Sequence, residues 1–332
     1  MKKILFIFLL LFLITYFFRS SINEIITGGV VFDENDEEIN LPYDFGDINL
    51  YFCQVDNCEE ELLKKIKESN KVECAFFELN LENIKSELKN KDYRLILDDR
   101  KSKEVSLVYI DDERKELMHN KFCIFDDSIV FTGSFNPTVN DNTKNDNNIV
   151  IIKSEVLAEN YKDEFNEMWN GNFGRGEIVR NPKLYFNNYL IENYFCPEDK
   201  CEEHVLDLLK TAKNRVYFMI FSFTSDKLGD EIIKSYHYGL DVKGIIDKTQ
   251  AGSEFSEFNK MKEIGMNVIK FRNKGFMHHK VFIVDDTVVF GSYNPSKSGN
   301  KDNDENILII HDSEIANEFL YEFDRIYGVT KS

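Results

Sequence analysis

Continuous apolar runs alternate along this chain with stripes of apolar residues at helical spacing. Every residue of the runs FMIF, FIV and ILII is apolar, without the alternation of apolar and polar residues seen in half-exposed strands. Such runs are typical of strands buried on both faces of a sheet. The stripe Leu62, Leu63 and Ile66 predicts a helix over about 59–69, and a similar stripe predicts another over 205–212. This order of elements predicts an α/β fold in which helices cover both faces of a sheet.

The same order of elements occurs twice. Cys53 and Cys196 are 143 residues apart, whereas His119 and His278 are 159 apart, so the second copy holds about sixteen additional residues. A duplication explains this match. It divides the chain into two repeats with a boundary within 171–192, and we place the repeats at 47–175 and 190–332.

The amino-terminal segment predicts an export signal. Two lysines precede fifteen uncharged and mostly apolar residues, Ile4 to Phe18, and Arg19 follows. This order of charges is typical of a secretory signal peptide or a short signal anchor, and it places the following residues outside the cytoplasm. We therefore expect residues 1–21 to be this signal or anchor, residues 22–46 to be a linker, and the protein to be secreted or membrane-anchored. The alternative, a buried helix, does not explain the flanking lysines.

Acidic residues outnumber basic ones, and the formal net charge is −18. Proteins that bind nucleic acid usually carry a basic surface, so this charge disfavours nucleic acid as a partner. The favoured partners are a phospholipid or another phosphodiester as substrate, and the membrane reached through the amino-terminal segment. The sequence carries no signal for an oligomeric state.

The cysteines form a repeated pattern. A Cys-x4-Cys pair stands at the start of each copy, and we expect each to form a local disulfide, joining Cys53 to Cys58 and Cys196 to Cys201. Free thiols in a reducing compartment are one alternative, and metal binding, for which only His204 lies near, is another. Cys74 and Cys123 lie in apolar runs and are predicted to be core residues.

Two stretches carry residues suited to phosphate chemistry, HNKFCIFDDSIVFTGSFN at 119–136 and HHKVFIVDDTVVFGSYN at 278–294. A histidine and a lysine two residues apart point to the same face of a strand, where an imidazole and an ammonium group converge. Further along, a glycine leaves room for a serine and an asparagine to approach phosphoryl oxygens. Two ordinary hairpins would explain one such stretch, but not its repetition in the same order. The candidate catalytic residues are His119, Lys121, Asp126, His278, Lys280 and Asp285, and the candidate phosphate-binding residues are Ser134, Asn136, Ser292 and Asn294.

The carboxylates in and after these stretches receive separate roles. We expect Asp126 and Asp285 to fix the strand ends and to pair with a base. Glu305 is the remaining catalytic candidate, because a carboxylate holds an imidazole in one tautomer. The equivalent position in the first copy is Asn147, which carries no charge. Since a carboxylate on the far ring nitrogen raises the basicity of an imidazole, we predict that Glu305 braces His278, which makes this histidine the nucleophile and that of the first copy the acid.

At these residues the chain resembles the phospholipase D superfamily, whose signature is HxK, four residues, Asp, and then Gly-Ser-x-Asn. The second half looks most like the small bacterial phosphodiesterases and nucleases of that family. The resemblance implies two α/β/α halves with mixed central sheets, related by a pseudo-twofold axis, with the histidines facing each other across the seam. It also implies hydrolysis through a phosphohistidine without metal or cofactor, and relatives usually attack with the histidine of the amino-terminal copy.

The function that we predict is a metal-independent phosphodiesterase of phospholipase D type acting on a phospholipid head group. An endonuclease is the first alternative, and the net charge weakens it. A phospholipid synthase or transphosphatidylase is another, although such relatives usually carry more membrane-spanning sequence. A non-catalytic scaffold with the same fold is the last, and the intact motifs of both copies argue against it.

Overall fold

The structure is a computed structural model that describes residues 30–32, 38–98, 100, 107, 110–112 and 114–331. The predicted signal or anchor, residues 1–21, and part of the predicted linker, residues 22–46, lie outside the described residues. Within the linker, an antiparallel pair and a strand of the second sheet are formed: β1 (Val30–Phe32), β2 (Glu38–Asn40) and β3 (Tyr43–Asp44). No helix in the part of the chain that the structure describes is both long and apolar enough to cross a bilayer.

The first half of the chain builds a mixed sheet of seven strands. Across the sheet their order is β4 (Ile48–Phe52), β10 (Asn148–Lys153), β9 (Ile129–Gly133), β8 (Lys121–Phe125), β5 (Lys71–Phe76), β6 (Asp92–Asp98) and β7 (Ile110–Asp112). β5, β6 and β7 are parallel neighbours, and the other pairs are antiparallel. The helices that the structure describes in this half are α2 (Cys58–Glu68), α3 (Glu82–Leu88), α5 (Val139–Thr143) and α6 (Glu155–Trp169).

The second half repeats this order in a sheet of nine strands. The order is β15 (Asn267–Lys270), β14 (Asp241–Ile246), β13 (Arg215–Ile220), β16 (Lys280–Val284), β17 (Thr287–Gly291), β18 (Glu305–His311), β12 (Tyr189–Cys196), β11 (Lys183–Phe186) and β3. β13, β14 and β15 are parallel neighbours, as β5, β6 and β7 are. The helices are α7 (Cys201–Lys210), α8 (Asp226–His237), η1 (Gln250–Gly252), α9 (Glu257–Glu263), α10 (Lys297–Lys301) and α11 (Ser313–Lys331). The prediction of an α/β fold with mixed sheets is confirmed.

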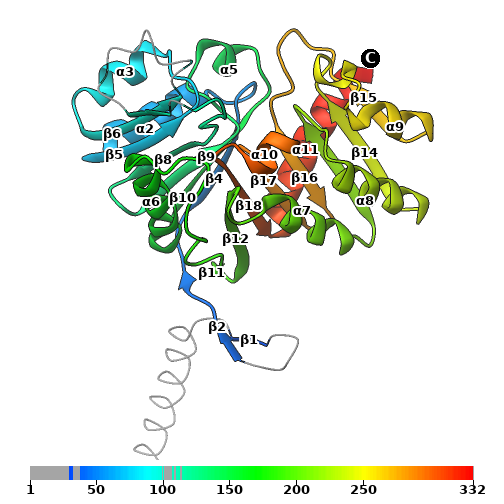
Figure 1. Ribbon diagram of the computed structural model, residues 1–332, viewed down its shortest axis with the longest axis horizontal. Helices are drawn as coiled ribbons and strands as arrows, with labels where there is room; N and C mark the ends of the chain where they lie inside the picture. The colour runs from blue at the N-terminus through cyan, green and yellow to red at the C-terminus, as the bar shows by residue number, and fades with distance from the viewer. Residues whose placement is uncertain are drawn as a thin grey trace, which may run out of the picture.

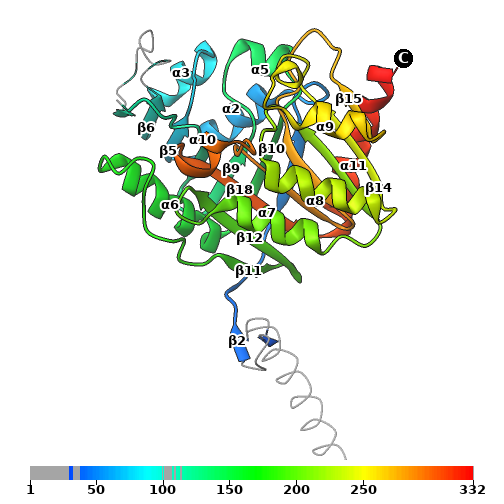
Figure 2. The same cartoon turned by 45° about the vertical axis from the view of Figure 1, so that its right-hand side comes forward.

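Successive strand residues point to two different parts of the core. On β13, Tyr217 and Met219 pack in a central cluster with α11, whereas Phe218 and Ile220 pack on the other face with α7, α8 and α9. Figures 1 and 2 show α11 behind the second sheet and α7 and α8 in front of it. The central cluster also contains Tyr161 of α6, so one hydrophobic core joins the two halves.

The six cysteines form three disulfides. Both predicted bonds, in the two Cys-x4-Cys loops, are present. Cys74 and Cys123 are buried, as predicted, but they are also joined to each other, which the sequence analysis missed. They are directly opposed on the antiparallel strands β5 and β8, with their Cα atoms 4.1 Å apart. Such short separations occur between directly opposed residues of an antiparallel pair.

Candidate active site

Both histidines lie where one half of the chain meets the other. His119 precedes β8, and its backbone N–H donates to the carbonyl of Asp304 at 3.0 Å. His278 precedes β16, and its backbone N–H donates to the carbonyl of Asp146 at 2.9 Å. The two hydrogen bonds are equivalent, since each links a histidine of one copy to an aspartate one or two residues before the last strand of the other, β18 or β10. The two motifs therefore meet at the seam between the sheets.

His119 is held by a carboxylate from the opposite half. Its Nδ1 lies 2.7 Å from Oε2 of Glu305, and both side chains are buried. Our prediction that Glu305 braces His278 is wrong, because β18 begins beside the backbone of the histidine of the other copy. Burial raises the pKa of Glu305 to about 8, although the neighbouring charges of Lys121 and Lys280 act in the opposite direction.

His278 is held by an amide. Its Nδ1 lies 2.7 Å from Oδ1 of Asn147. The Nδ2 group of Asn147 donates to the carbonyls of Asp141 and Asn145, at 3.4 and 3.3 Å, so the amide is oriented with its oxygen towards the imidazole. Because a carboxamide oxygen only accepts, Nδ1 of His278 carries the proton. The lone pair of the neutral ring is therefore on Nε2.

A second carboxylate, which the sequence analysis missed, lies near His278. Oδ2 of Asp141 is 3.7 Å from Nδ1 of His278. The same oxygen accepts from the backbone N–H and the Nδ2 group of Asn136, at 2.8 and 2.9 Å. The repeat does not reveal Asp141, since Gly299 stands at the equivalent position of the second copy. A search for charges that differ between the copies would have found it.

Both motif lysines are buried beside the histidines. Nζ of Lys121 donates to the carbonyl of His119 at 2.6 Å, and Nζ of Lys280 donates to that of His278 at 2.7 Å. Burial lowers the pKa of Lys121 to about 8 and, together with the charge of Lys121, lowers the pKa of Lys280 to about 7. Two ammonium groups held this close suit a ligand that carries negative charge, such as a phosphate.

The imidazoles themselves are disfavoured as cations. Burial, followed by the charges of the two lysines, lowers the pKa of His119 and of His278 well below its ordinary value. Phe77 and Phe221 pack against the two rings, with centroids 5.4 and 5.2 Å apart, and contribute to this burial. In the free site, burial and the two lysines therefore favour the neutral form of both imidazoles.

The glycine and serine of each motif bring two strands close together. Gly133 and Gly291 have φ of 148° and 156°, and a Cβ on either would lie 2.3 or 2.2 Å from a carbonyl oxygen of the next strand. Oγ of Ser134 and Oγ of Ser292 accept backbone N–H groups of β10 and β18, at 3.1 and 3.0 Å. The serines thus fix the strands that carry the partners of the histidines.

The motif asparagines differ from the serines, because part of each amide is unused. Across the described ranges, Oδ1 of Asn136 and Oδ1 of Asn294 are buried without a hydrogen-bond partner. Buried carbonyl oxygens are rarely left in this state. These two oxygens are available to a hydrogen-bond donor on a ligand.

Asp126 and Asp285 lie at the ends of β8 and β16 that are opposite to the histidines. Both residues have positive φ, at 46° and 51°. The carboxylate of Asp126 accepts the backbone N–H groups of residues 70 and 71, and that of Asp285 accepts those of residues 213–215. They fix the strand ends, as expected. Their grouping with the catalytic residues and their pairing with a base are corrected, because their partners are backbone amides.

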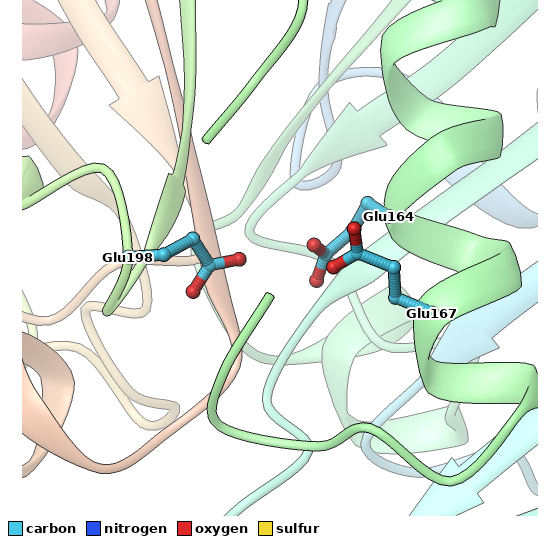
Figure 3. Close-up of side chains that lie close together, drawn as sticks. All are labelled: Glu164, Glu167 and Glu198. Carbon is cyan, nitrogen blue, oxygen red and sulfur yellow. The ribbon is translucent and has the colours of Figure 1, made fainter. Parts of the chain in front are cut away.

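A cluster of three carboxylates lies outside the two motifs. Glu164 and Glu167 on α6 face Glu198, which follows β12, and one oxygen of each lies within 4.8 Å of the others (Figure 3). Burial raises the pKa of Glu198 to about 7 and also raises that of Glu164. In the second copy Arg325 stands in place of Glu167 and pairs with Glu322. Over the residues the structure describes, this is the group that could hold a cation, and carboxylates suit calcium or magnesium.

Comparison with known proteins identifies the family. A family profile described as "Cardiolipin synthase, PLD-like domain" matches residues 51–169 and 205–327. A mitochondrial cardiolipin hydrolase of Chlamydomonas reinhardtii is 26% identical over 145 residues, which cover 41% of this chain and 65% of the relative. The mitochondrial cardiolipin hydrolase of Mus musculus is 32% identical over 124 residues, which cover 37% of this chain and 56% of the relative. The chain thus spans less than two thirds of the length of these relatives.

The fold has a counterpart among solved structures. The phosphatidylserine synthase of Haemophilus influenzae Rd KW20 superposes with a TM-score of 0.65 at 12% identity, covering 87% of this chain and 88% of that one. Because the family profile covers more than half of the sequence, the chain belongs to the phospholipase D superfamily. Within the superfamily, the profile that matches is the PLD-like domain described for cardiolipin synthase.

Proposed function

We propose that this protein is a metal-independent phosphodiesterase of phospholipase D type, which hydrolyses a phospholipid head-group ester through a phosphohistidine at His119. One observation carries the proposal: each half supplies a histidine, buried or nearly so, whose Nδ1 is held by a side chain of the other half, Glu305 or Asn147. A buried lysine lies beside each histidine. A nucleophile, a proton donor and positive charge for the phosphoryl oxygens are thus present in one site.

His119 is the nucleophile in this proposal. While Glu305 accepts from Nδ1–H, the lone pair on Nε2 attacks phosphorus and forms a P–N bond. The P–O bond to the leaving alcohol breaks, and protonated His278 donates its Nε2 proton to that oxygen. The carboxylate stabilises the cationic phosphohistidine. The sequence analysis assigned the nucleophile to His278, because the histidine held by Glu305 should be the stronger base. The same argument now selects His119, since Glu305 contacts that histidine.

Water completes the reaction. His278, now neutral at Nε2, takes a proton from a water molecule whose oxygen attacks phosphorus. The P–N bond breaks, its electron pair returns to Nε2 of His119, and the phosphomonoester leaves. Lys121 and Lys280 compensate the charge on the phosphoryl oxygens in both steps.

A phospholipid is favoured as the substrate on two grounds. The net charge of −18 opposes the approach of a polyanion such as nucleic acid. The relatives named above are cardiolipin hydrolases, and the family profile is described for cardiolipin synthase. We further propose an extracytoplasmic location, secreted or membrane-anchored, which the three disulfides and the apolar amino-terminal sequence support.

The test is a substrate panel without added metal. The full chain is incubated with bis(p-nitrophenyl) phosphate, cardiolipin, phosphatidylcholine and single-stranded DNA, and the variants His119→Ala and His278→Ala serve as controls. We expect release of a phosphomonoester from a phospholipid by the unmodified protein and by neither variant. Cleavage of DNA in preference to both lipids would support the endonuclease alternative, and inactivity on all four would contradict the proposal.

A further inference from the structure

We propose that Asp141 is a positioning residue that favours the cationic, proton-donating form of His278 and supplies the charge that the first copy lacks at Asn147. The inference rests on the proposed function, because it takes His278 to be the acid. It concerns a residue that neither motif contains and that has no counterpart in the second copy.

Asp141 and Gly299 occupy equivalent places in the two halves. α5 is capped by Thr138, whose Oγ1 accepts the N–H of Asp141 at 3.2 Å. α10 is capped by Ser296, whose Oγ accepts the N–H of Gly299 at 3.2 Å. A Cβ on Gly299 would lie 2.3 Å from the carbonyl oxygen of Asn294, so the second half has no room for a side chain there. The first half holds a carboxylate at this place, 4% exposed.

The carboxylate of Asp141 compensates for the uncharged residue at position 147. Glu305 gives His119 a hydrogen-bond acceptor and, when it is ionised, a negative charge in the same group. Its counterpart Asn147 gives His278 the acceptor alone. Asp141 lies 3.7 Å from the same Nδ1 and supplies the charge. Asn147 and Asp141 of the first half thus provide separately the acceptor and the carboxylate that Glu305 of the second half combines.

The charge matters because His278 cannot act as an acid while it is neutral. Its proton is on Nδ1, facing Asn147, so a proton reaches Nε2 only in the imidazolium form. Burial lowers the pKa of His278 most. Four titratable groups lower it further: Lys280, Lys121, His119 and His279. The carboxylates on that side are Asp141, and Asp247, which accepts the backbone N–H of Met277. A carboxylate this close typically raises the pKa of its neighbour by about 1–3 units.

Asp141 is held in place by three hydrogen bonds. Its carboxylate accepts the backbone N–H and the Nδ2 group of Asn136, at 2.8 and 2.9 Å, and Nδ2 of Asn145 at 2.6 Å. These contacts fix the carboxylate beside the ring of His278. The same charge raises the pKa of Lys121 and of Lys280, against their burial. Asp141 therefore supports the lysines as well as the acid.

The first experiment measures the titration of His278 directly and does not depend on activity. Ring ¹⁵N chemical shifts of the full chain are followed against pH in the unmodified protein and in Asp141→Asn, which keeps the shape and removes the charge. We expect the midpoint of His278 to fall by about 1–3 pH units. Asp126→Asn is the matched control, because it removes a carboxylate at the far end of β8, and it should leave the midpoint unchanged.

The second experiment uses the leaving group. Asp141→Asn should slow hydrolysis of an alkyl phosphodiester at pH 7 by about 10- to 100-fold and move the alkaline limb of kcat to lower pH. A p-nitrophenyl ester, whose leaving group needs little help from an acid, should be affected much less. The double variant Asp141→Gly with Asn147→Glu rebuilds the arrangement of the second half and should restore both the rate and the pH limb.

The outcomes separate this inference from the proposed function. An unchanged His278 midpoint in Asp141→Asn overturns the inference, whatever the activity. An unmodified protein that is inactive on every diester overturns the proposed function, while the titration result still decides whether Asp141 charges His278. If Asp141→Asn does not fold, the double variant decides, and a His278 midpoint below that of the unmodified protein would overturn the proposal.

Discussion

His119 and Glu305 belong to different halves of the chain, yet Nδ1 of the imidazole and Oε2 of the carboxylate are 2.7 Å apart. The contact exists because β18 begins at the seam, where the N–H of His119 binds the carbonyl of the residue before Glu305. It gives the histidine of the first copy the partner that a nucleophile needs. His278 has an amide in the same place.

This asymmetry predicts which histidine carries the phosphoryl group. In His278→Ala, a p-nitrophenyl ester should still phosphorylate His119, because its leaving group needs no acid, and the intermediate should persist without a base to activate water. Glu305→Gln should slow turnover by about 10- to 100-fold, because the imidazole loses its charged partner. The site of the label is determined by mass spectrometry of peptides. A label on His278, or substantial turnover of a natural diester by either alanine variant, would contradict the mechanism.

The lowered pKa values of the two motif lysines predict that the protein takes up protons when it binds an anion above neutral pH. The pKa of Lys280 is about 7 and that of Lys121 about 8 in the free protein, because burial favours the neutral amine. A bound anion favours the ammonium form, so binding at pH 8 should take up about one proton, whereas binding at pH 6, where both lysines are already charged, should take up almost none. Calorimetric titration with sulfate in buffers of different ionisation enthalpy measures this number.

Two variants test the assignment of that proton. Lys280→Gln should remove most of the uptake at pH 8, since a glutamine does not titrate. Glu305→Gln should retain it, although the pKa of Glu305 is also raised. The reverse result would mean that the glutamate, and not the lysine, takes up the proton.

Much of the fold and the residues of the motifs could be predicted, because both depend on local order. Continuous apolar runs and helical spacing predicted the elements, and the repeated motifs predicted His119, Lys121, His278 and Lys280. The partner of each histidine could not be predicted, because it depends on which strand end crosses the seam. Alignment of the two copies assigned Glu305 to its own half, whereas the folded chain places it in the other.

Two further features lay outside what repetition can show. Asp141 occurs in one copy only, so a search for shared residues passed over it. The bond between Cys74 and Cys123 depends on the pairing of β5 with β8, which the sequence does not state. The role of each residue depends on a contact between segments that are distant in the sequence.

The three disulfides close loops of different length, so we expect their removal to lower the free energy of unfolding by different amounts. The bond between Cys74 and Cys123 spans 49 residues, whereas each of the others spans 5. In the chain-entropy model, closing the long loop contributes roughly 4 kcal/mol and closing a short one roughly 2 kcal/mol. Replacing both cysteines of the long loop by alanine should therefore lower the free energy of unfolding more than the same change at Cys53 and Cys58. Denaturant unfolding of the oxidised protein measures the difference.

Peptide mapping under non-reducing conditions provides the control for this comparison. It should recover all three linked pairs from protein made in an oxidising compartment. Six free thiols in exported protein would contradict the disulfide assignment and remove one support for the proposed location.

A chelation experiment tests whether the two lysines neutralise the charge of the phosphate without a metal ion. Lys121 and Lys280 are both buried beside the histidines and supply positive charge there. We therefore expect turnover to persist in EDTA, with kcat within about twofold of its value without chelator, since each twofold change corresponds to only about 0.4 kcal/mol in the barrier. Turnover that is lost in EDTA and restored by zinc or magnesium would contradict the metal-independent mechanism.

The glutamate cluster provides the control for the chelation experiment. Glu164, Glu167 and Glu198 are carboxylates that a divalent cation could bind, and they lie outside the two motifs. A cation bound there would stabilise the folded chain by mass action, so the melting temperature would rise as the free cation concentration exceeds the dissociation constant. Glu167→Gln should abolish any such shift while leaving turnover in EDTA unchanged. If the variant instead made turnover independent of a metal that the unmodified protein requires, the cluster would be coupled to the active site.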